Sequence, residues 1–205
     1  ERYRLEAQAA VRRVSPGDHE ALERRLRRYK YRELLRIAAR DVCLRAPTQE
    51  LGLEQSHLAE ALIAAALDHC AEAEGSGFCV LALGKLGGED LNFSSDVDLI
   101  YVYRPDGHAG DRFHKLGETL TKRLAAHTAD GFCYRVDLNL RPQGRSGAIV
   151  LSLPSMLAYY EAHGRAWERA ALLKARPIAG DLSVGRELLE ALKPFIWRRS
   201  LDLGA

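Results

Sequence analysis

The spacing of apolar residues changes twice along the chain and divides it into three parts. Up to Glu74, apolar residues recur at helical spacing. Interruptions of this spacing predict three helices: one ending near residues 15–17, one from an Asp18 cap to about Arg45, and one from Ser56 onward. Glycines in the stretch 75–77 close this helical segment, which we place at residues 1–77.

The middle part has the short apolar runs and glycine boundaries that are typical of a sheet. Residues 78–83 and 97–103 are predicted strands. A helix between residues 113 and 131 follows from apolar residues at helical spacing and a glycine after its end. Residues 132–141 alternate between apolar and polar side chains, which predicts a third strand with one core face and one polar face. A fourth strand is expected at residues 148–152.

The pattern from Pro154 to the end is helical again, and proline suits the first turn of a helix. The predicted fold class is therefore α+β. A small mixed β-sheet core at residues 78–153 lies between a helical N-terminal segment and a helical C-terminal segment, residues 154–205, that packs on the core.

Composition narrows the functional classes. The chain has 205 residues, 47% of them apolar, which suffices for one sizeable core. Its apolar runs are far shorter than the roughly 20 residues that cross a bilayer, and no signal segment opens it, so we expect no membrane attachment and a cytoplasmic location. Because Glu1 already lies in a predicted helix, we expect a fragment of a larger protein. The net charge of +2 does not indicate nucleic-acid binding.

Two residue classes receive structural interpretations. The four cysteines, at positions 43, 70, 79 and 133, lack the spacing of a zinc site and are expected to be packed thiols. Basic residues between Arg24 and Arg40 alternate with leucines along the second predicted helix. This pattern favours a solvated or interdomain face over a docking surface.

A glycine-rich stretch between the first two predicted strands carries the first candidate chemistry. Residues 84–98 read Gly-Lys-Leu-Gly-Gly-Glu-Asp-Leu-Asn-Phe-Ser-Ser-Asp-Val-Asp, which matches neither a P-loop nor a dinucleotide-binding motif. Gly87 and Gly88 permit close backbone approach, and N–H groups there are candidates to hold a phosphate. Asp96 and Asp98 are two residues apart in a strand, so their side chains point to one face, about 7 Å apart.

Carboxylates aligned in this way repel each other, and a divalent cation would offset that repulsion. We therefore interpret Asp96 and Asp98 as metal ligands rather than as turn or strand-edge acids. Asp137 stands on the polar face of the third strand, where pairing with Arg135 or Arg141 is the alternative. Three carboxylates on one sheet face predict a two-metal site for phosphoryl or nucleotidyl transfer, and Mg²⁺ and Mn²⁺ suit it equally.

Two downstream segments add candidate contacts. The turn after the third strand holds Arg141 and Arg145, whose guanidinium groups suit phosphate oxygens. Glu168 and Lys174 lie in a predicted helix, either near the site or as part of a salt-bridged helix that packs on the sheet.

These motifs together resemble the two-headed glutamine synthetase adenylyltransferases, whose catalytic halves are polymerase-beta-like nucleotidyltransferases. The resemblance covers nearly the whole chain. It is carried by residues 31–37, 84–88, 91–100, 134–138, 140–142 and 167–176. In that family one half attaches AMP to a tyrosine of glutamine synthetase, and the other removes it with inorganic phosphate and releases ADP. Residues 92–95, the Glu168–Arg169 pair and the tail 194–202 look more like the AMP-removing half.

The resemblance implies roles for individual residues. Asp96 and Asp98 would bind both metal ions, and Asp137 would hold the ion that orients the nucleophile. The nucleotide, ADP or ATP, would meet Gly87, Gly88 and Ser95 through its phosphates, and Arg141 would steady the transferred or incoming group. Implied partners are glutamine synthetase and a nitrogen-signalling protein of the PII type. Two departures, Asp90 and Asn139, spare the carboxylates and affect only the fine contacts to substrate.

Other functions remain open from the sequence. The same fold could run ATP-dependent adenylyl transfer onto glutamine synthetase, or act on a small molecule or an RNA end, although the weak basic balance counts against RNA. A rival of another class is a non-catalytic module that senses nucleotide or docks a partner. Retention of all three acids argues against it.

Overall fold

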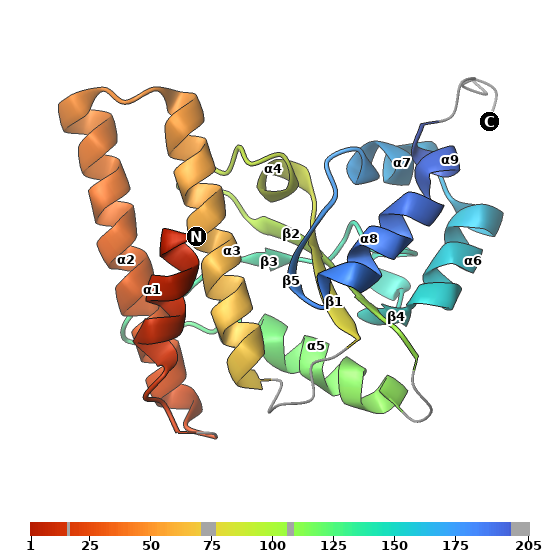
Figure 1. Ribbon diagram of the computed structural model, residues 1–205, viewed down its shortest axis with the longest axis horizontal. Coiled ribbons are helices and arrows are strands. Elements are labelled where there is room, and N and C mark those ends of the chain that lie inside the picture. The colour runs from red at the N-terminus through yellow and green to blue at the C-terminus, as the bar shows by residue number, and fades with distance from the viewer. Residues whose placement is uncertain (16, 71–76, 106–108, 198–205) are drawn as a thin grey trace.

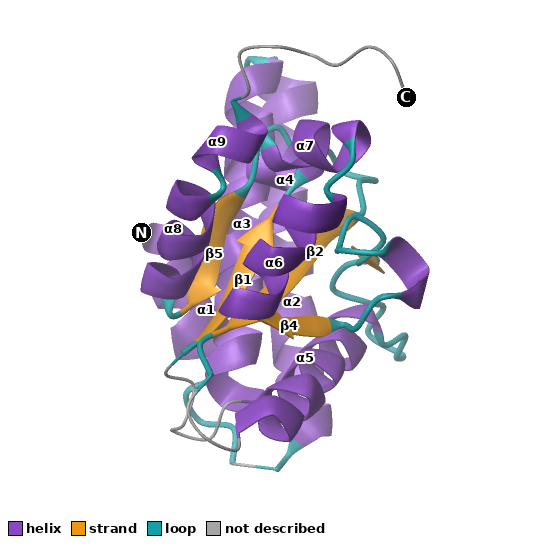
Figure 2. Ribbon diagram, turned by 90° about the vertical axis from the view of Figure 1, so that its right-hand side faces the viewer, coloured by secondary structure: helices purple, strands orange, loops and turns teal. Residues whose placement is uncertain are grey.

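A mixed sheet lies between two layers of helices in the computed structural model, which describes residues 1–15, 17–70, 77–105 and 109–197 (Figures 1 and 2). The helices are α1 (Arg2–Val11), α2 (His19–Leu44), α3 (Thr48–Cys70), α4 (Gly84–Gly87), α5 (Ala109–Ala125), α6 (Leu153–His163), α7 (Ala166–Leu172), α8 (Leu182–Ala191) and α9 (Lys193–Ile196). The strands are β1 (Phe78–Ala82), β2 (Val97–Tyr103), β3 (Val136–Asp137), β4 (Val150–Ser152) and β5 (Arg176–Gly180). The predicted α+β class is confirmed.

The sheet order is β3-β2-β1-β5, and β4 also pairs with β2. β1 runs antiparallel to β2 and β5, whereas β2 runs parallel to β3 and β4. Val80 and Tyr101 face α1, α2, α3 and α5, while Leu81 and Ile100 face α6 to α9. Because side chains alternate along a strand, β1 and β2 are buried on both faces. The core under the first helical layer therefore includes residues on both sides of position 77.

The N-terminal helices follow the prediction with two shifts. α1 ends at Val11, before the expected residues 15–17. Asp18 caps α2, and its Oδ1 accepts the Ala21 N–H at 3.0 Å. α3 begins at Thr48, eight residues before the expected Ser56. Gly52 lies inside this helix. It lets the helix pack closely on the Asp90 backbone, because a Cβ at position 52 would come within 3.3 Å of it. The predicted closure at 75–77 lies outside the described residues except for Gly77.

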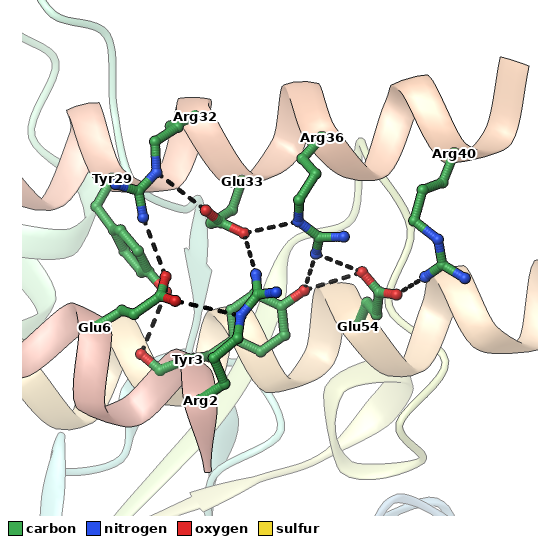
Figure 3. Close-up of polar contacts among 9 residues, drawn as sticks. All are labelled: Arg2, Tyr3, Glu6, Tyr29, Arg32, Glu33, Arg36, Arg40 and Glu54. Carbon is green, nitrogen blue, oxygen red and sulfur yellow. Dashed lines mark hydrogen bonds and ion pairs between the residues drawn. The ribbon is translucent and has the colours of Figure 1, made fainter. Parts of the chain in front are cut away.

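Ion pairs join α1, α2 and α3 along their exposed edge (Figure 3). Glu33 accepts hydrogen bonds from Arg2 at 2.6 Å and from Arg36 at 2.9 Å. Arg36 also bonds Glu54 of α3 at 2.5 Å. Part of the predicted solvated or interdomain face of α2 is thus a helix-to-helix contact, while Arg24, Arg25 and Arg28 are exposed. The other members of this network are Tyr3, Glu6, Tyr29, Arg32 and Arg40.

Arg27 of α2 is fully buried and ties this helix to the end of α5. Its guanidinium donates to the Gly131 carbonyl at 2.9 Å and to the carbonyls of Ala126 and Arg123. α5 ends at Ala125 rather than at the predicted Asp130, and the three carbonyls lie in its last turn or after it. The helical segment is therefore anchored to the core through backbone groups as well as through side-chain packing.

Two predictions about the sheet were wrong. Residues 132–141 do not form a long strand, because Cys133 and Tyr134 both donate their N–H groups to the Leu124 carbonyl, at 3.2 and 3.0 Å, and both side chains are buried. Only Val136 and Asp137 pair with β2. The region after Pro154 is not entirely helical, since Arg176–Gly180 forms β5 at the sheet edge.

Other expectations concern cysteines and membranes. All four cysteines are free thiols; Cys79 and Cys133 are buried and Cys70 is partly buried, but Cys43 is exposed, so the expected packing is wrong for Cys43. Within the described ranges, none of the helices has the length and apolar character required to span a membrane.

Candidate functional site

The three predicted acids meet where β2 and β3 begin to pair. Asp98 lies opposite Asp137 in the parallel register, so their Cα atoms sit on neighbouring strands, about 4.8 Å apart. Asp96 precedes Asp98 by two residues. Burial raises the pKa of Asp98, and the negative charges of Asp137 and Asp96 raise it further. The structure thus places three carboxylates within electrostatic reach of one another.

Gly84 makes room for the Asp98 carboxylate. Its φ of +54° lies in the left-handed region, and a Cβ at this position would come within 2.2 Å of Asp98 Oδ2. The residue before Gly84 also contacts Asp98: the Leu83 N–H donates a hydrogen bond to the Asp98 backbone carbonyl at 2.9 Å. Sequence reasoning gave Gly84 no separate role, although a glycine directly after a buried strand was the available signal.

Lys85 is a second residue that sequence reasoning left without a role. It follows Gly84 on α4, its side chain is exposed, and it is the cation whose charge opposes the upward pKa shift of Asp98. No ion pair of Lys85 with another described residue is present. Its ammonium group is therefore available to an anionic ligand at the acids.

Gly87 and Gly88 form the last turn of α4. Their N–H groups donate to the carbonyls of Leu83 at 2.8 Å and Gly84 at 3.1 Å. A Cβ on Gly87 would lie 2.2 Å from the Lys174 carbonyl, so this glycine permits close packing of the segment before β5. The predicted phosphate contact of these two glycines stays a prediction, because their N–H groups are used inside the helix here.

Ser95 belongs to the tight turn that leads into Asp96. Its hydroxyl donates to Asn92 Oδ1 at 2.8 Å, and the Ser94 N–H donates to the same oxygen at 3.1 Å. The turn is tied to α3 by a hydrogen bond of 3.1 Å from the Leu91 N–H to Ser56 Oγ. Ser95 therefore helps to shape the backbone that presents Asp96.

Asp96 and Asp137 each have a protein partner. Arg135 donates from Nε to Asp96 Oδ1 and from Nη2 to the Ser94 carbonyl. Asp137 Oδ1 accepts the Asn139 N–H at 2.6 Å. The alternative interpretation of Asp137, an ion pair with Arg135 or Arg141, is not what the structure shows, because Arg135 pairs with Asp96.

Arg141 is a buried scaffold of the loop after β3. Its guanidinium donates to the carbonyls of Leu138 at 2.8 Å, Arg145 at 3.1 Å and Gly147 at 3.0 Å. Its Nε also bonds the Gly147 carbonyl, at 3.1 Å. Burial lowers the pKa of Arg141, and the charge of Asp137 acts in the opposite direction. Four of its five N–H donors are thus used by the loop.

Glu168 and Lys174 do not pair with each other. Glu168 is buried near the start of α7 and bonds Tyr159, whereas Lys174 pairs with Asp90 at 3.0 Å. The predicted salt-bridged helix is therefore wrong for these two residues. The chain leaves helix at Leu172 and reaches β5 at Arg176.

The donor set suits a hard divalent cation such as Mg²⁺ or Mn²⁺, which prefers carboxylate oxygens. Neither Asp98 carboxylate oxygen accepts a hydrogen bond from the described residues, although two like charges lie nearby. Within the same ranges, no three acidic, histidine or cysteine side chains already surround one point as metal ligands. Asp96 and Asp137 would have to turn from Arg135 and the Asn139 amide to join Asp98 around an ion.

Comparison with known proteins assigns the chain to a family. A bifunctional glutamine synthetase adenylyltransferase/adenylyl-removing enzyme of Thioalkalivibrio sulfidiphilus is 45% identical over 92% of this chain and 22% of the relative. Similar relatives bearing the same description come from Hahella chejuensis, at 42% identity over 90% of this chain and 21% of the relative, and from Pseudomonas aeruginosa, at 40% over 98% and 23%. The chain thus spans only about a fifth of the length of these enzymes.

The model of one protein family, described as glutamate-ammonia ligase adenylyltransferase, matches residues 1–191. Family members carry the names of nucleotidyl-transferring enzymes. The match includes the glycine-rich stretch, all three acids and the Arg141 loop. The chain belongs to the glutamate-ammonia ligase adenylyltransferase family.

Proposed function

We propose that this chain carries a metal-dependent adenylyl-removing activity. It would take AMP from an adenylylated tyrosine of glutamine synthetase by phosphorolysis and release ADP. The observation that carries the proposal is the pairing of Asp98 with Asp137, with Asp96 two residues away and no cation of the described residues hydrogen-bonded to Asp98. Carboxylates in this arrangement are a ligand set for phosphoryl and nucleotidyl transfer.

The reaction is a displacement at the α-phosphorus of adenylyl-tyrosine. An oxygen of hydrogen phosphate forms the new P–O bond, the bond to the tyrosyl oxygen breaks, and the proton of hydrogen phosphate ends on that oxygen. A divalent ion, when bound, would neutralise charge on the phosphoryl oxygens. Asp96, Asp98 and Asp137 are the residues that we propose to hold it, as Mg²⁺ or Mn²⁺.

The remaining contacts are assigned by position. Lys85 stands beside Asp98 with a free ammonium group that suits a phosphoryl oxygen. Gly87, Gly88 and Ser95 remain proposed contacts of the nucleotide phosphates. Arg141 acts mainly through the loop that it holds, since four of its donors are already used.

The direction of transfer rests on the sequence resemblance to the AMP-removing half. The names of the similar proteins contain two activities, adenylyl transfer and adenylyl removal. ATP-dependent attachment of AMP is therefore the second candidate. Partners in either direction would be glutamine synthetase and, for regulation, a PII-type protein. The non-catalytic alternative predicts nucleotide binding without turnover.

A direct assay separates these functions. The intact protein is incubated with adenylylated glutamine synthetase, phosphate and Mg²⁺ or Mn²⁺, and ADP is measured. In parallel it is incubated with unmodified glutamine synthetase and ATP, and protein-bound AMP is measured. ADP formation that disappears in Asp98→Asn supports the proposal. AMP attachment alone would assign the opposite direction, and no turnover in either reaction would leave the non-catalytic role.

A further inference from the structure

Glu168 is a buried carboxylate that the proposed reaction does not use. It is 1% exposed and stands in the first turn of α7. Its Oε2 accepts the Arg165 N–H at 2.8 Å, and its Oε1 accepts the Tyr159 hydroxyl at 2.9 Å. Because a buried carboxylate is unfavourable unless its oxygens are hydrogen-bonded, Glu168 both depends on Tyr159 and fixes its position.

Tyr159 connects Glu168 to the loop after β3 by a second hydrogen bond. Its hydroxyl accepts the Gln143 N–H at 3.1 Å while donating to Glu168. Gln143 has a φ of +62°, a left-handed conformation that is unfavourable for residues other than glycine. The hydrogen bond from its N–H to Tyr159 therefore helps to hold an unfavourable backbone conformation in place.

Gln143 begins a short turn, Gly144–Ser146, that is connected to Asp137 by hydrogen bonds. Gly144 donates to the Arg141 carbonyl at 2.8 Å. Arg145 Nε donates to Asn139 Oδ1 at 3.2 Å, and the Asn139 N–H bonds Asp137 Oδ1 at 2.6 Å. Contacts thus run without a gap from the buried Glu168 to the Asp137 carboxylate.

A cavity of about 630 Å³ lies along the same turn. Its wall is made by Asn139, Gln143, Gly144, Ser146, Tyr159 and His163, with Arg165 and Trp167 beside them. Asn139, whose N–H bonds Asp137, is thus part of the wall of a space large enough for part of a substrate. A shift of Gln143 would change both the cavity wall and the environment of Asp137.

We propose that Glu168 and Tyr159 are positioning residues of the acid site. They hold Gln143 in its left-handed conformation, and the turn that follows orients Asn139 and, through its N–H, Asp137. This inference rests on the proposed function, because it takes Asp137 to act in the reaction. The competing explanation is that Glu168 only caps α7 and contributes to stability.

The deciding variants combine Tyr159→Phe with a change at Gln143. Tyr159→Phe removes one hydroxyl and should lower kcat for phosphorolysis about tenfold, as expected for the loss of one hydrogen bond near 1.4 kcal/mol. The KM for phosphate should change less than about twofold, because no phosphate contact is removed. Glycine adopts left-handed φ without penalty, so Tyr159→Phe/Gln143→Gly should regain most of the kcat. Tyr159→Phe/Gln143→Ala, the matched control, should not.

A second measurement follows the turn without any reaction. Amide hydrogen exchange at Gln143 and Gly144 in the substrate-free intact protein should accelerate in Tyr159→Phe and in Glu168→Gln. The added Gln143→Gly change should slow the exchange of Gly144 again. A role confined to capping α7 would lower the unfolding temperature of Glu168→Gln without this pattern.

The outcomes separate the inference from the proposed function. Unchanged kcat in Tyr159→Phe, or equal rescue by glycine and alanine at position 143, would overturn the inference while phosphorolysis stands. If the unmodified protein forms no ADP, the proposed function fails. The exchange data then decide alone, and unchanged exchange at Gln143 and Gly144 in Tyr159→Phe overturns the inference.

Discussion

Asp98 and Asp137 face each other across the parallel pairing of β2 with β3, and the pKa of Asp98 is raised by burial and by the charge of Asp137. A folded protein in which this carboxyl has a raised pKa is least stable when the group is ionised. Without metal, stability contributed by this site should therefore increase as pH falls through the folded-state pKa of Asp98. The same carboxylate would be stabilised at neutral pH by a bound cation.

Asp98→Asn should separate stability from activity. The substitution removes one of three like charges, so the metal-free protein should become more stable, by less than about 1 kcal/mol because solvent screens the half-exposed group. Activity should fall more than about 100-fold if the proposed function holds, since a proposed metal ligand is lost. Thermal unfolding in a chelator and the ADP assay measure the two effects. Asp68→Asn, on α3 away from the site, is the control and should alter neither.

Divalent ions should stabilise the unmodified protein through the same residues. Mg²⁺ or Mn²⁺ at about 100 times its dissociation constant is expected to add about 2.7 kcal/mol to the free energy of unfolding. Thermal unfolding with and without the ion tests this expectation. An equal shift in Asp98→Asn would place the ion elsewhere.

Gly84→Ala should disturb the acids directly. The new Cβ would lie 2.2 Å from Asp98 Oδ2, and φ there is +54°. We expect a loss of stability above the about 1–2 kcal/mol of left-handed strain alone, together with reduced activity. Gly17→Ala is matched, because Gly17 has φ +83° and nothing within 4 Å of the added Cβ. Equal destabilisation of the two variants would contradict a steric role for Gly84.

Arg141→Lys tests the loop scaffold against direct phosphate contact. Lysine keeps the charge but cannot reach the carbonyls of Leu138, Arg145 and Gly147 together, so stability should fall by about 1–3 kcal/mol. Chemical denaturation measures this change. A protein of unchanged stability with a raised KM for phosphate would instead favour the contact predicted from the sequence. Arg13→Lys, at an exposed position, is the control.

Glu33 makes the helix network pH-sensitive. Burial alone would raise its pKa, but hydrogen bonds from Arg36 and Arg32 and the charges of Arg36 and Arg2 outweigh burial and lower it. A carboxyl with a lowered folded-state pKa stabilises the fold above its unfolded pKa, about 4.3, and loses that contribution as pH falls through the folded value. Unfolding measured from pH 7 to pH 3 should show a smaller loss for Glu33→Gln than for the unmodified protein. Glu20→Gln, on the exposed first turn of α2, should follow the unmodified curve.

The sequence predicted the parts of the fold that depend on local pattern. The buried runs of β1 and β2 and the Asp18 cap are properties of short segments, and the structure reproduces them. Asp96 was expected in the same strand as Asp98, but β2 begins at Val97, so Asp96 belongs to the turn before the strand. The meeting of these acids with Asp137 was inferred from a strand that proved to be two residues long. Asp137 is one of those two residues, so the structure places it opposite Asp98, whereas the role of the three acids as metal ligands stays a prediction.

The remaining features depend on tertiary contacts. Alternation in residues 132–135 resembled a strand, but Cys133 and Tyr134 bond the end of α5 instead. β5 was missed because it begins Arg176-Pro177, and proline is tolerated in a strand mainly at a sheet edge. The Arg135–Asp96 pair follows from the β2–β3 register, which no local pattern specifies.

The contacts of Arg27 affect how the protein unfolds. Its buried guanidinium joins α2 to the end of α5, so melting α2 would take the charge into solvent and leave the carbonyls of Gly131, Ala126 and Arg123 without this donor. Helices and sheet should therefore lose structure in one cooperative transition. We therefore expect a chain without α1 and α2 to fail to fold, because the sheet would lose part of the core that these helices bury.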